Sequence, residues 1–114
     1  MTAYVGTVTS GSGNYANQNL LLLIKDSLVT EGWTVLRYDV GVEPRELIVQ
    51  GVGYSGTEEI YLGFRSYQSV GSDYYNLSVS TFIGYVSGNA YAAQPGYVEN
   101  SLCAHNTTID YWIN

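Results

Sequence analysis

The sequence is poor in charged residues, and positive charge is the scarcest of all. Charged residues make up 12% of the 114 residues, and four Lys and Arg against ten Asp and Glu give a net charge of −6. Nucleic-acid binding requires clustered cations that displace counterions from phosphates, and anionic membranes attract basic clusters in the same way. The four cations are scattered along the chain, at Lys25, Arg37, Arg45 and Arg65. We therefore expect no nucleic-acid partner and no attraction to an anionic membrane.

Cysteine and histidine are almost missing, which limits catalytic and metal chemistry. One cysteine, Cys103, cannot form an internal disulfide bond. Together with the single histidine, His105, it cannot fill a tetrahedral zinc shell, and no acidic run resembles a calcium loop. A nucleophilic cysteine also needs a base and a group that orients the base, and the sequence nominates no such third group. We expect no cofactor, no metal and no enzyme activity, with Cys103 as a buried structural residue beside a surface histidine.

Long apolar runs are missing as well. The longest, Leu20 to Ile24, is far shorter than the roughly 20 residues that span a bilayer. The first twelve residues lack a basic segment followed by an apolar core, so they do not resemble a signal peptide. We expect no membrane insertion and a protein made and folded in a cytoplasm.

The hydrophobic content and the length of the chain predict a single folded domain. Hydrophobic residues make up 46% of the chain, which is within the globular range, and 114 residues is close to the commonest domain size. Residues 1–13 are small, β-branched and rich in glycine, without a periodicity that could bury a face. We expect them to form a flexible arm, or a strand that becomes ordered against a partner. Residues 14–114 are expected to form one α+β domain.

One long helix is expected over residues 15–31. Asn14 precedes it as a possible N-cap, and Gly32 follows it as a residue free to take a positive φ. Its apolar stripe at helical spacing consists of Leu20, Leu23, Ile24 and Leu28. Leu21 and Leu22 widen the stripe, so we expect the helix to be covered on more than one side.

After Gly32 the periodicity changes to two, which predicts strands. We expect strands over residues 33–39, 45–50, 58–67 and 75–84, a short helical turn within 97–105, and a last strand over 107–113. The apolar run 47–49 predicts cover on both faces of its strand. Ile60, Leu62 and Phe64 are expected to point inward, and the alternation in 75–84 sets Leu77, Val79, Thr81 and Ile83 on one face. The short links favour antiparallel pairing, because parallel strands need long crossovers. The predicted fold is α+β, with one N-terminal helix packed on a mainly antiparallel four- to five-stranded sheet. The alternative is a β-sandwich with an added helix.

One glycine-rich segment matches a nucleotide-binding pattern. Gly51-Val-Gly53-Tyr-Ser-Gly56 fits G-x-G-x-x-G and follows a predicted strand. That mechanism requires the glycines to open a helix, whose N-terminus holds the phosphates. The residues that follow predict a strand, and Glu58 and Glu59 would repel phosphate. A hairpin connection is the better interpretation.

Aromatic residues are the most abundant functional candidates, with twelve tyrosines in the chain. Tyrosine supplies a large contact area, a polar end and little rotamer entropy to lose, so it is enriched at protein interfaces, although strands also favour it. A sugar-binding platform could use the same rings by stacking. The candidate interface residues are Tyr4, Tyr74, Tyr75, Tyr85, Tyr91, Tyr97, Tyr111 and Trp112.

Several phrases resemble a group of bacteriophage virion proteins of the tail and baseplate region. They are Gly32-Trp33-Thr-Val, Arg45-Glu46-Leu-Ile-Val-Gln-Gly51, Thr57-Glu-Glu-Ile-Tyr-Leu-Gly63, Phe82-Ile-Gly84-Tyr85, Gln94-Pro95-Gly96 and Tyr111-Trp112. The resemblance covers about residues 8–113. It implies no active-site residues, because these phrases are structural landmarks.

The resemblance also implies a role and a location. It implies a structural virion protein, present in several copies around a symmetry axis and assembled in the host cytoplasm. Its partners would be other phage tail proteins and copies of itself, with residues 1–13 and 107–114 as points of attachment. The alternative is a carbohydrate- or receptor-binding module at a tail tip.

Overall fold

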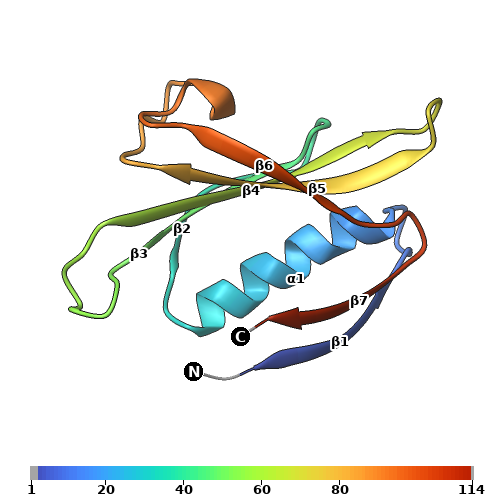
Figure 1. Cartoon of the computed structure of the whole chain (residues 1–114), viewed down its shortest axis with the longest axis horizontal. Helices are drawn as coiled ribbons and strands as arrows, with labels where there is room; N and C mark the ends of the chain where they lie inside the picture. Colours follow the sequence, from blue (N-terminus) through green and yellow to red (C-terminus); the bar gives the residue numbers. More distant parts are fainter. Residues whose placement is uncertain (1–2, 114) are drawn as a thin grey trace.

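One helix lies between two β-sheets in the computed structural model, which describes residues 3–113 (Figure 1). A five-stranded sheet packs on one side of the helix and a two-stranded ribbon lies on the other. In chain order the elements are β1 (Tyr4–Thr9), α1 (Ala16–Thr30), β2 (Thr34–Asp39), β3 (Glu46–Gly51), β4 (Ile60–Ser69), β5 (Tyr74–Phe82), the 3₁₀ helix η1 (Tyr91–Ala93), β6 (Val98–Cys103) and β7 (Thr108–Ile113).

The start of α1 differs in detail from the expectation. The backbone N–H of Tyr15, the residue before the helix, donates a hydrogen bond to Gln18 Oε1 at 2.8 Å. Asn14 is not the N-cap. Its side chain instead accepts a hydrogen bond from Arg45 at 2.8 Å and donates one to Asn19 at 3.2 Å, so it ties the helix start to the β2–β3 connection.

The end of α1 is fixed by Gly32, as expected. Gly32 has a φ of +92°, a conformation that L side chains rarely adopt. Its N–H donates to the carbonyl of Val29, and the N–H of Trp33 donates to the carbonyl of Leu28. These two bonds form a Schellman motif, which satisfies carbonyls that the helix itself leaves free.

The five-stranded sheet confirms the predicted α+β fold. Its order is β2-β3-β4-β5-β6, with every neighbouring pair antiparallel. A bulge between Val35 and Arg37 shifts the pairing of β2 with β3. Because of it, Val35 and Tyr38 both pack on the helix side, although they lie three residues apart.

The main core fills the space between α1 and this sheet. Leu21 of the helix meets Leu47, Val49 and Leu77 of the sheet, and all four are buried. Burying each such side chain contributes about 1.5–3 kcal/mol relative to leaving it in water. Leu62 and Phe64 of β4 pack on the same side, as their alternation predicted.

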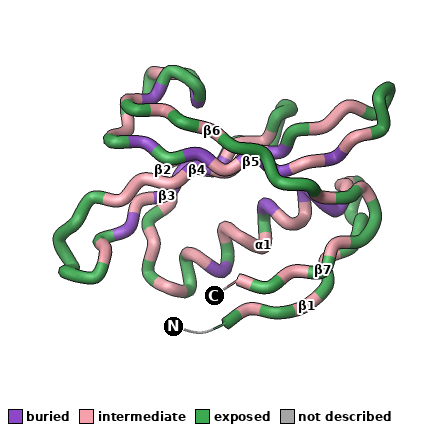
Figure 2. Tube along the Cα trace, viewed as in Figure 1, coloured by how far each residue is buried: buried purple, intermediate pink, exposed green. Residues whose placement is uncertain are grey.

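A second, smaller core covers the opposite face of the sheet. Ile48 and Phe82 of the sheet are buried there together with Tyr91, which comes from the overlying segment of residues 83–97. Leu47, Ile48 and Val49 of β3 are all completely buried, which confirms the expectation that this strand is covered on both faces. Cover on the second face also buries Ser78 and Ser80 of β5, both 1% exposed (Figure 2).

Three expectations about the chain ends and the last third are corrected. The segment expected as a flexible arm, or as a strand ordered by a partner, contains β1, which pairs along its whole length with β7 of the same chain, from Tyr4 opposite Ile113 to Thr9 opposite Thr108. Residues 1 and 2 of that segment, and Asn114, lie outside the described residues. The helical turn expected within 97–105 is instead strand β6. Strand β5 ends at Phe82, and Ile83, expected to alternate inward, is 81% exposed.

Candidate interaction surface

The eight candidate aromatic residues do not share one surface. Tyr75 and Tyr91 are buried, and Trp112 is 73% exposed. The other five are half-buried: Tyr4, Tyr74, Tyr85, Tyr97 and Tyr111. The expectation of a tyrosine-rich outer surface is therefore corrected for Tyr75 and Tyr91, which the domain uses for its own packing.

Tyr91 attaches residues 83–97 to the sheet. Its ring packs edge-on against Phe82, with centroids 5.5 Å apart, and its hydroxyl donates a hydrogen bond to Ser80 Oγ at 2.9 Å. The Arg65 guanidinium lies 4.6 Å from the ring centroid. Burial raises the pKa of Tyr91 well above its ordinary value, so the hydroxyl keeps its proton and serves as a donor. Tyr91 is a packing residue.

Arg65 and Glu99 join β4 to β6 across β5. Arg65 Nε and Nη2 donate to the two carboxylate oxygens of Glu99 at 2.7 and 3.0 Å, and Nη2 also reaches Tyr97 Oη at 3.2 Å. Partial burial acts to raise the pKa of Glu99, but hydrogen bonds from Arg65 and Tyr97 hold it below its ordinary value. Burial and the hydrogen bond to Glu99 raise the pKa of Tyr97. The polar groups of Arg65, Glu99 and Tyr97 therefore find their hydrogen-bond partners in one another.

The loop over residues 84–94 is held by further internal bonds. Arg37 Nη2 donates to the carbonyls of Ser87 at 3.1 Å and Asn89 at 2.7 Å. Gln94, 3% exposed, accepts from the Val86 N–H at 2.8 Å and donates to the Val86 carbonyl at 2.9 Å. The loop is thus pinned to the sheet by side chains from β2 and from within itself.

All four Lys and Arg side chains lie within the described residues, and each contacts a carboxylate. The pairs are Lys25–Asp26 at 3.2 Å, Arg37–Glu46 at 3.4 Å, Arg45–Glu43 at 3.0 Å and Arg65–Glu99 at 2.7 Å. No basic patch remains on this part of the molecule to meet phosphates.

Cys103 and His105 do not form a catalytic pair in the described part of the chain. Cys103 is exposed on β6, which corrects the expectation of a buried structural cysteine. His105 Nδ1 accepts hydrogen bonds from the Thr107 N–H at 3.1 Å and the Thr108 N–H at 3.5 Å. An accepting Nδ1 leaves the proton on Nε2. The imidazole therefore shapes the link between β6 and β7.

The remaining sites considered from the sequence have structural explanations. Residues 52–59 connect β3 to β4, and the Glu58 N–H donates a hydrogen bond to the Val52 carbonyl at 2.9 Å, so the glycines open a hairpin loop and not a helix. Within residues 3–113, no group of three or more His, Cys, Asp or Glu side chains is placed to hold a metal ion.

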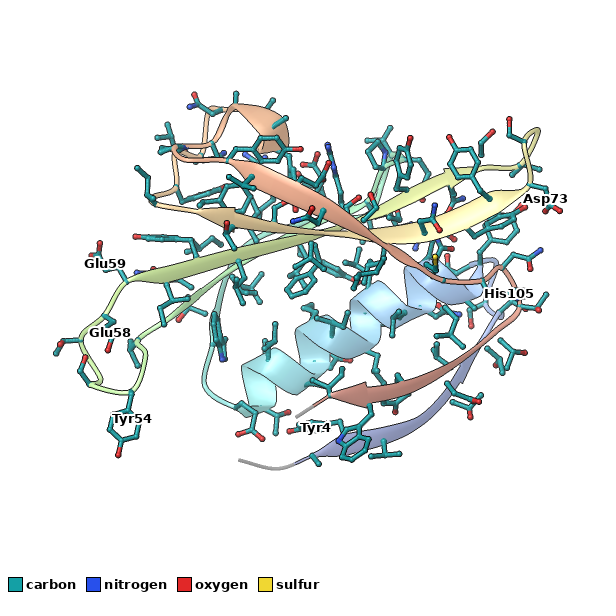
Figure 3. The ribbon with its side chains drawn as sticks, in the orientation of Figure 1. Tyr4, Tyr54, Glu58, Glu59, Asp73 and His105 are labelled. Carbon is teal, nitrogen blue, oxygen red and sulfur yellow. The ribbon has the colours of Figure 1, made fainter. Side chains whose placement is uncertain are left out.

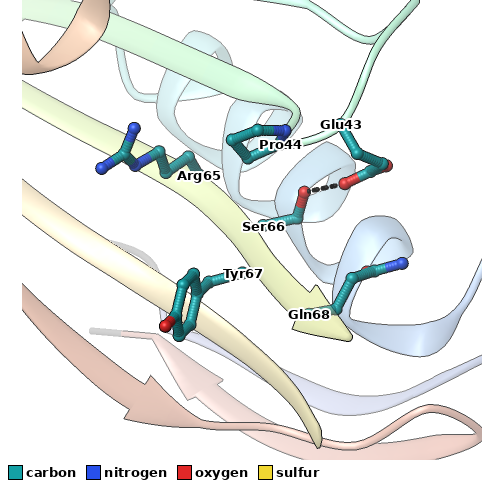
Figure 4. A pocket seen from close by; sticks show the side chains of 6 residues that line it. All are labelled: Glu43, Pro44, Arg65, Ser66, Tyr67 and Gln68. Carbon is teal, nitrogen blue, oxygen red and sulfur yellow. Dashed lines mark hydrogen bonds between the residues drawn. The ribbon is translucent and has the colours of Figure 1, made fainter. Parts of the chain in front are cut away.

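A hollow of about 330 Å³ lies beside the end of β4 (Figure 4). Glu43 and Ser66 line it, together with Pro44, Arg65, Tyr67 and Gln68. The Glu43 carboxylate accepts hydrogen bonds from Ser66 Oγ at 2.6 Å, from Arg45 Nε at 3.0 Å and from the Gln18 side chain. Its oxygens therefore anchor the β2–β3 connection to the helix and the sheet.

The outer face of the β1/β7 ribbon presents a pair of large apolar side chains to solvent. Val5 is 69% and Trp112 is 73% exposed, and the two lie opposite each other across the ribbon. Beyond them, Thr7 Oγ1 donates to Asp110 Oδ1 at 2.7 Å. The inner face bears alternate residues of the same strands, of which Tyr4 donates to Glu31 at 3.1 Å and so ties the ribbon to the end of α1. Sequence reasoning found Trp112 but missed Val5.

Two tyrosines that the sequence analysis did not single out are exposed. Tyr54 stands free at the tip of the β3–β4 hairpin, and Figure 3 shows it pointing away from the body of the domain. Tyr67 is 49% exposed and stacks loosely on Tyr74, with centroids 5.4 Å apart. The sequence feature that could have indicated an exposed Tyr54 is its position in a glycine-rich loop.

Comparison with known proteins adds no relatives, since no protein-family model and no curated protein matches the chain. Among residues 3–113, no helix combines the length and the apolar character that crossing a membrane requires.

Proposed function

We propose that this chain is a non-enzymatic structural protein of a bacteriophage tail or baseplate, which bridges neighbouring subunits. It would be assembled in the host cytoplasm and carried in the virion. The resemblance over residues 8–113 supports the virion setting. The Val5–Trp112 pair supports the bridging role and is the observation on which the proposal depends.

The ribbon suits a contact with another protein. Tryptophan anchors interfaces more often than most residues, because its large rigid ring loses little entropy when it is covered. Here it lies beside a second exposed apolar side chain, on a face without an exposed cation. The two chain ends, expected from sequence to be separate points of attachment, combine in one surface.

The phrases that carry the resemblance have packing roles, which supports a structural interpretation. A Cβ on Gly51 would lie 2.9 Å from the Trp33 ring, and a Cβ on Gly63 would lie 2.6 Å from Phe82. Gly32 ends the helix. None of these residues requires catalytic chemistry to explain it.

The sugar-binding alternative receives no such support. Of the candidate rings that could stack on a sugar, Tyr91 is buried, and the hydroxyl of Tyr97 contacts Arg65. A sugar would need a free ring face, and Tyr91 has none.

The proposal is tested on virions produced by the phage genome that encodes the chain. A photo-reactive phenylalanine analogue replaces Thr108, an exposed residue on the outer face of the ribbon, and the same analogue replaces Tyr54 as the control at the distant hairpin tip. After irradiation of purified particles, we expect the analogue at position 108 to join the chain to another virion protein, with little joining from position 54.

Two results would contradict the proposal. If mass spectrometry does not detect the chain in purified, infectious particles, the virion role is wrong. If the chain is present but the analogue at position 108 never cross-links, the ribbon is not the contact.

A further inference from the structure

Strand β6 is an edge of the five-stranded sheet and is mostly exposed to solvent. Among the described strands it pairs with β5 alone. Val98 is 59% and Leu102 is 53% exposed, and in the whole strand Glu99 is the one residue that is half-buried (Figure 2). An edge strand presents unpaired N–H and C=O groups in a row, which is a template for another strand.

This edge lacks the usual protection against pairing. Proteins block edges with lysine, proline, bulges or covering segments. The β6 sequence contains neither lysine nor proline, and its register with β5 is unbroken from Val98 to Cys103. Its one charged residue, Glu99, is paired with Arg65. The opposite edge, β2, is protected by a bulge and by the charged residues Arg37 and Asp39.

The segments on either side of β6 leave the sheet on opposite faces. Residues 83–97 lie over the face opposite α1, where Tyr91 and Arg37 hold them. The link to β7 runs on the helix side toward the ribbon (Figure 1). The free edge between them is therefore accessible.

We propose that β6 pairs antiparallel with β6 of a second copy of this chain, about a two-fold axis perpendicular to the sheet. Asn100 would lie opposite Asn100 of the second copy. The result is a continuous sheet of ten strands, five from each copy. This contact is separate from the ribbon surface and does not rest on the proposed virion role.

The side chains select this register. With Asn100 on the axis, Val98 lies opposite Leu102 of the second copy, and this apolar pair occurs twice on the helix-side face. A shift of two residues one way places Glu99 opposite Glu99, and like charges directly opposite are destabilising. A shift the other way places Leu102 opposite Asn100. A shift of one residue would place side chains of the helix-side face of one copy beside side chains of the opposite face of the second copy.

The first experiment measures self-association of the purified chain by sedimentation velocity over a wide concentration range. A pairing of six residues is smaller than a standard interface, so we expect a dimer with a dissociation constant on the order of 10–100 µM. Leu102→Lys adds a protecting lysine at an exposed position and should weaken association about tenfold or more. Val42→Lys, at an apolar position 75% exposed in the β2–β3 loop, is the matched control and should leave association unchanged.

The second experiment tests the register by disulfide trapping in a Cys103→Ser background. Asn100→Cys places two thiols opposite each other across the axis, with Cα atoms about 4.5–5.5 Å apart, which a disulfide can span. Ser101→Cys places its thiol opposite Glu99 and is the control. We expect rapid oxidation to a covalent dimer for Asn100→Cys alone.

The outcomes are decisive in both directions. A chain that stays monomeric up to millimolar concentration, or a dimer that Leu102→Lys does not weaken, overturns the pairing. Equal trapping of the Asn100→Cys and Ser101→Cys variants overturns the register.

Discussion

Gly63 of β4 leaves the space that the Tyr91 hydroxyl occupies. A Cβ at position 63 would lie 2.5 Å from Tyr91 Oη, closer than any real contact permits. The same hydroxyl donates to Ser80 Oγ at 2.9 Å, so the tyrosine is held between β4 and β5. Because Gly63 has no side chain, the Tyr91 ring fits against β4, and this contact attaches residues 83–97 to the sheet.

This relationship predicts the effect of Gly63→Ala. The added methyl group meets Tyr91 and Phe82, and overpacking of this kind costs about 1–3 kcal/mol. We expect a lower unfolding free energy in urea denaturation. Gly88→Ala is the control, because nothing lies within 4 Å of a Cβ there. An unchanged stability for Gly63→Ala would show that residues 83–97 do not pack as described.

Tyr91→Phe removes the hydroxyl and keeps the ring. It leaves Ser80, which is 1% exposed, without this partner, and losing such a buried hydrogen bond costs about 1–3 kcal/mol. Tyr54→Phe removes an exposed hydroxyl and should change stability by less than about 0.5 kcal/mol. Chemical denaturation of the two variants checks the difference, and equal losses would contradict the internal role of Tyr91.

Glu99 predicts a loss of stability in acid. Its pKa in the folded chain is below the ordinary 4.5, so the unfolded chain binds the proton more tightly. The stability that it contributes is therefore present above that ordinary value and is lost as the pH falls through the folded pKa. We expect Glu99→Gln to be less stable than the parent at neutral pH and to lose less between about pH 5 and 3. Glu59→Gln, at an exposed position in the β3–β4 connection, is the control and should follow the parent curve.

The helix and the central strands could be predicted because their signals are local. Leu21 and its neighbours carry a helical period, and Gly32 stops the helix by its own conformational freedom. The pairing of β1 with β7 could not be predicted in this way. Tyr4 and Ile113 meet because both strands pack on α1, and no short-range pattern records that contact.

The cover over β5 on the second face of the sheet was beyond sequence reasoning, although the apolar run of β3 indicated that this strand is covered on both faces. Ser78 and Ser80 alternate with apolar residues, a pattern typical of a face exposed to water. They are buried because residues 83–97 fold back over them, and Tyr91 supplies the partner for Ser80. Three of the tyrosines that suggested an outer surface, Tyr85, Tyr91 and Tyr97, belong to this packing. The candidate surface therefore moved to Trp112 and to Val5, a valine with no distinguishing sequence pattern.

Trp112 and Tyr111 are neighbours in β7, and the ribbon places them on opposite faces. Tyr111 is half-buried toward α1, where its hydroxyl lies 2.9 Å from the position of a Cβ on Gly6, while Trp112 is 73% exposed. Trp112→Ser should therefore change the unfolding free energy by less than about 1 kcal/mol, and Tyr111→Ser by about 2–4 kcal/mol. Fluorescence offers an independent measurement, because the other tryptophan, Trp33, is half-buried.

In the parent chain, acrylamide should quench the red-shifted part of the emission first, and Trp112→Ser should remove that part. If Trp112→Ser unfolds the chain, or if the remaining emission is as easily quenched as before, the tryptophan belongs to the interior. The outer face of the ribbon would then lack the anchor on which the proposed contact with a neighbouring subunit depends.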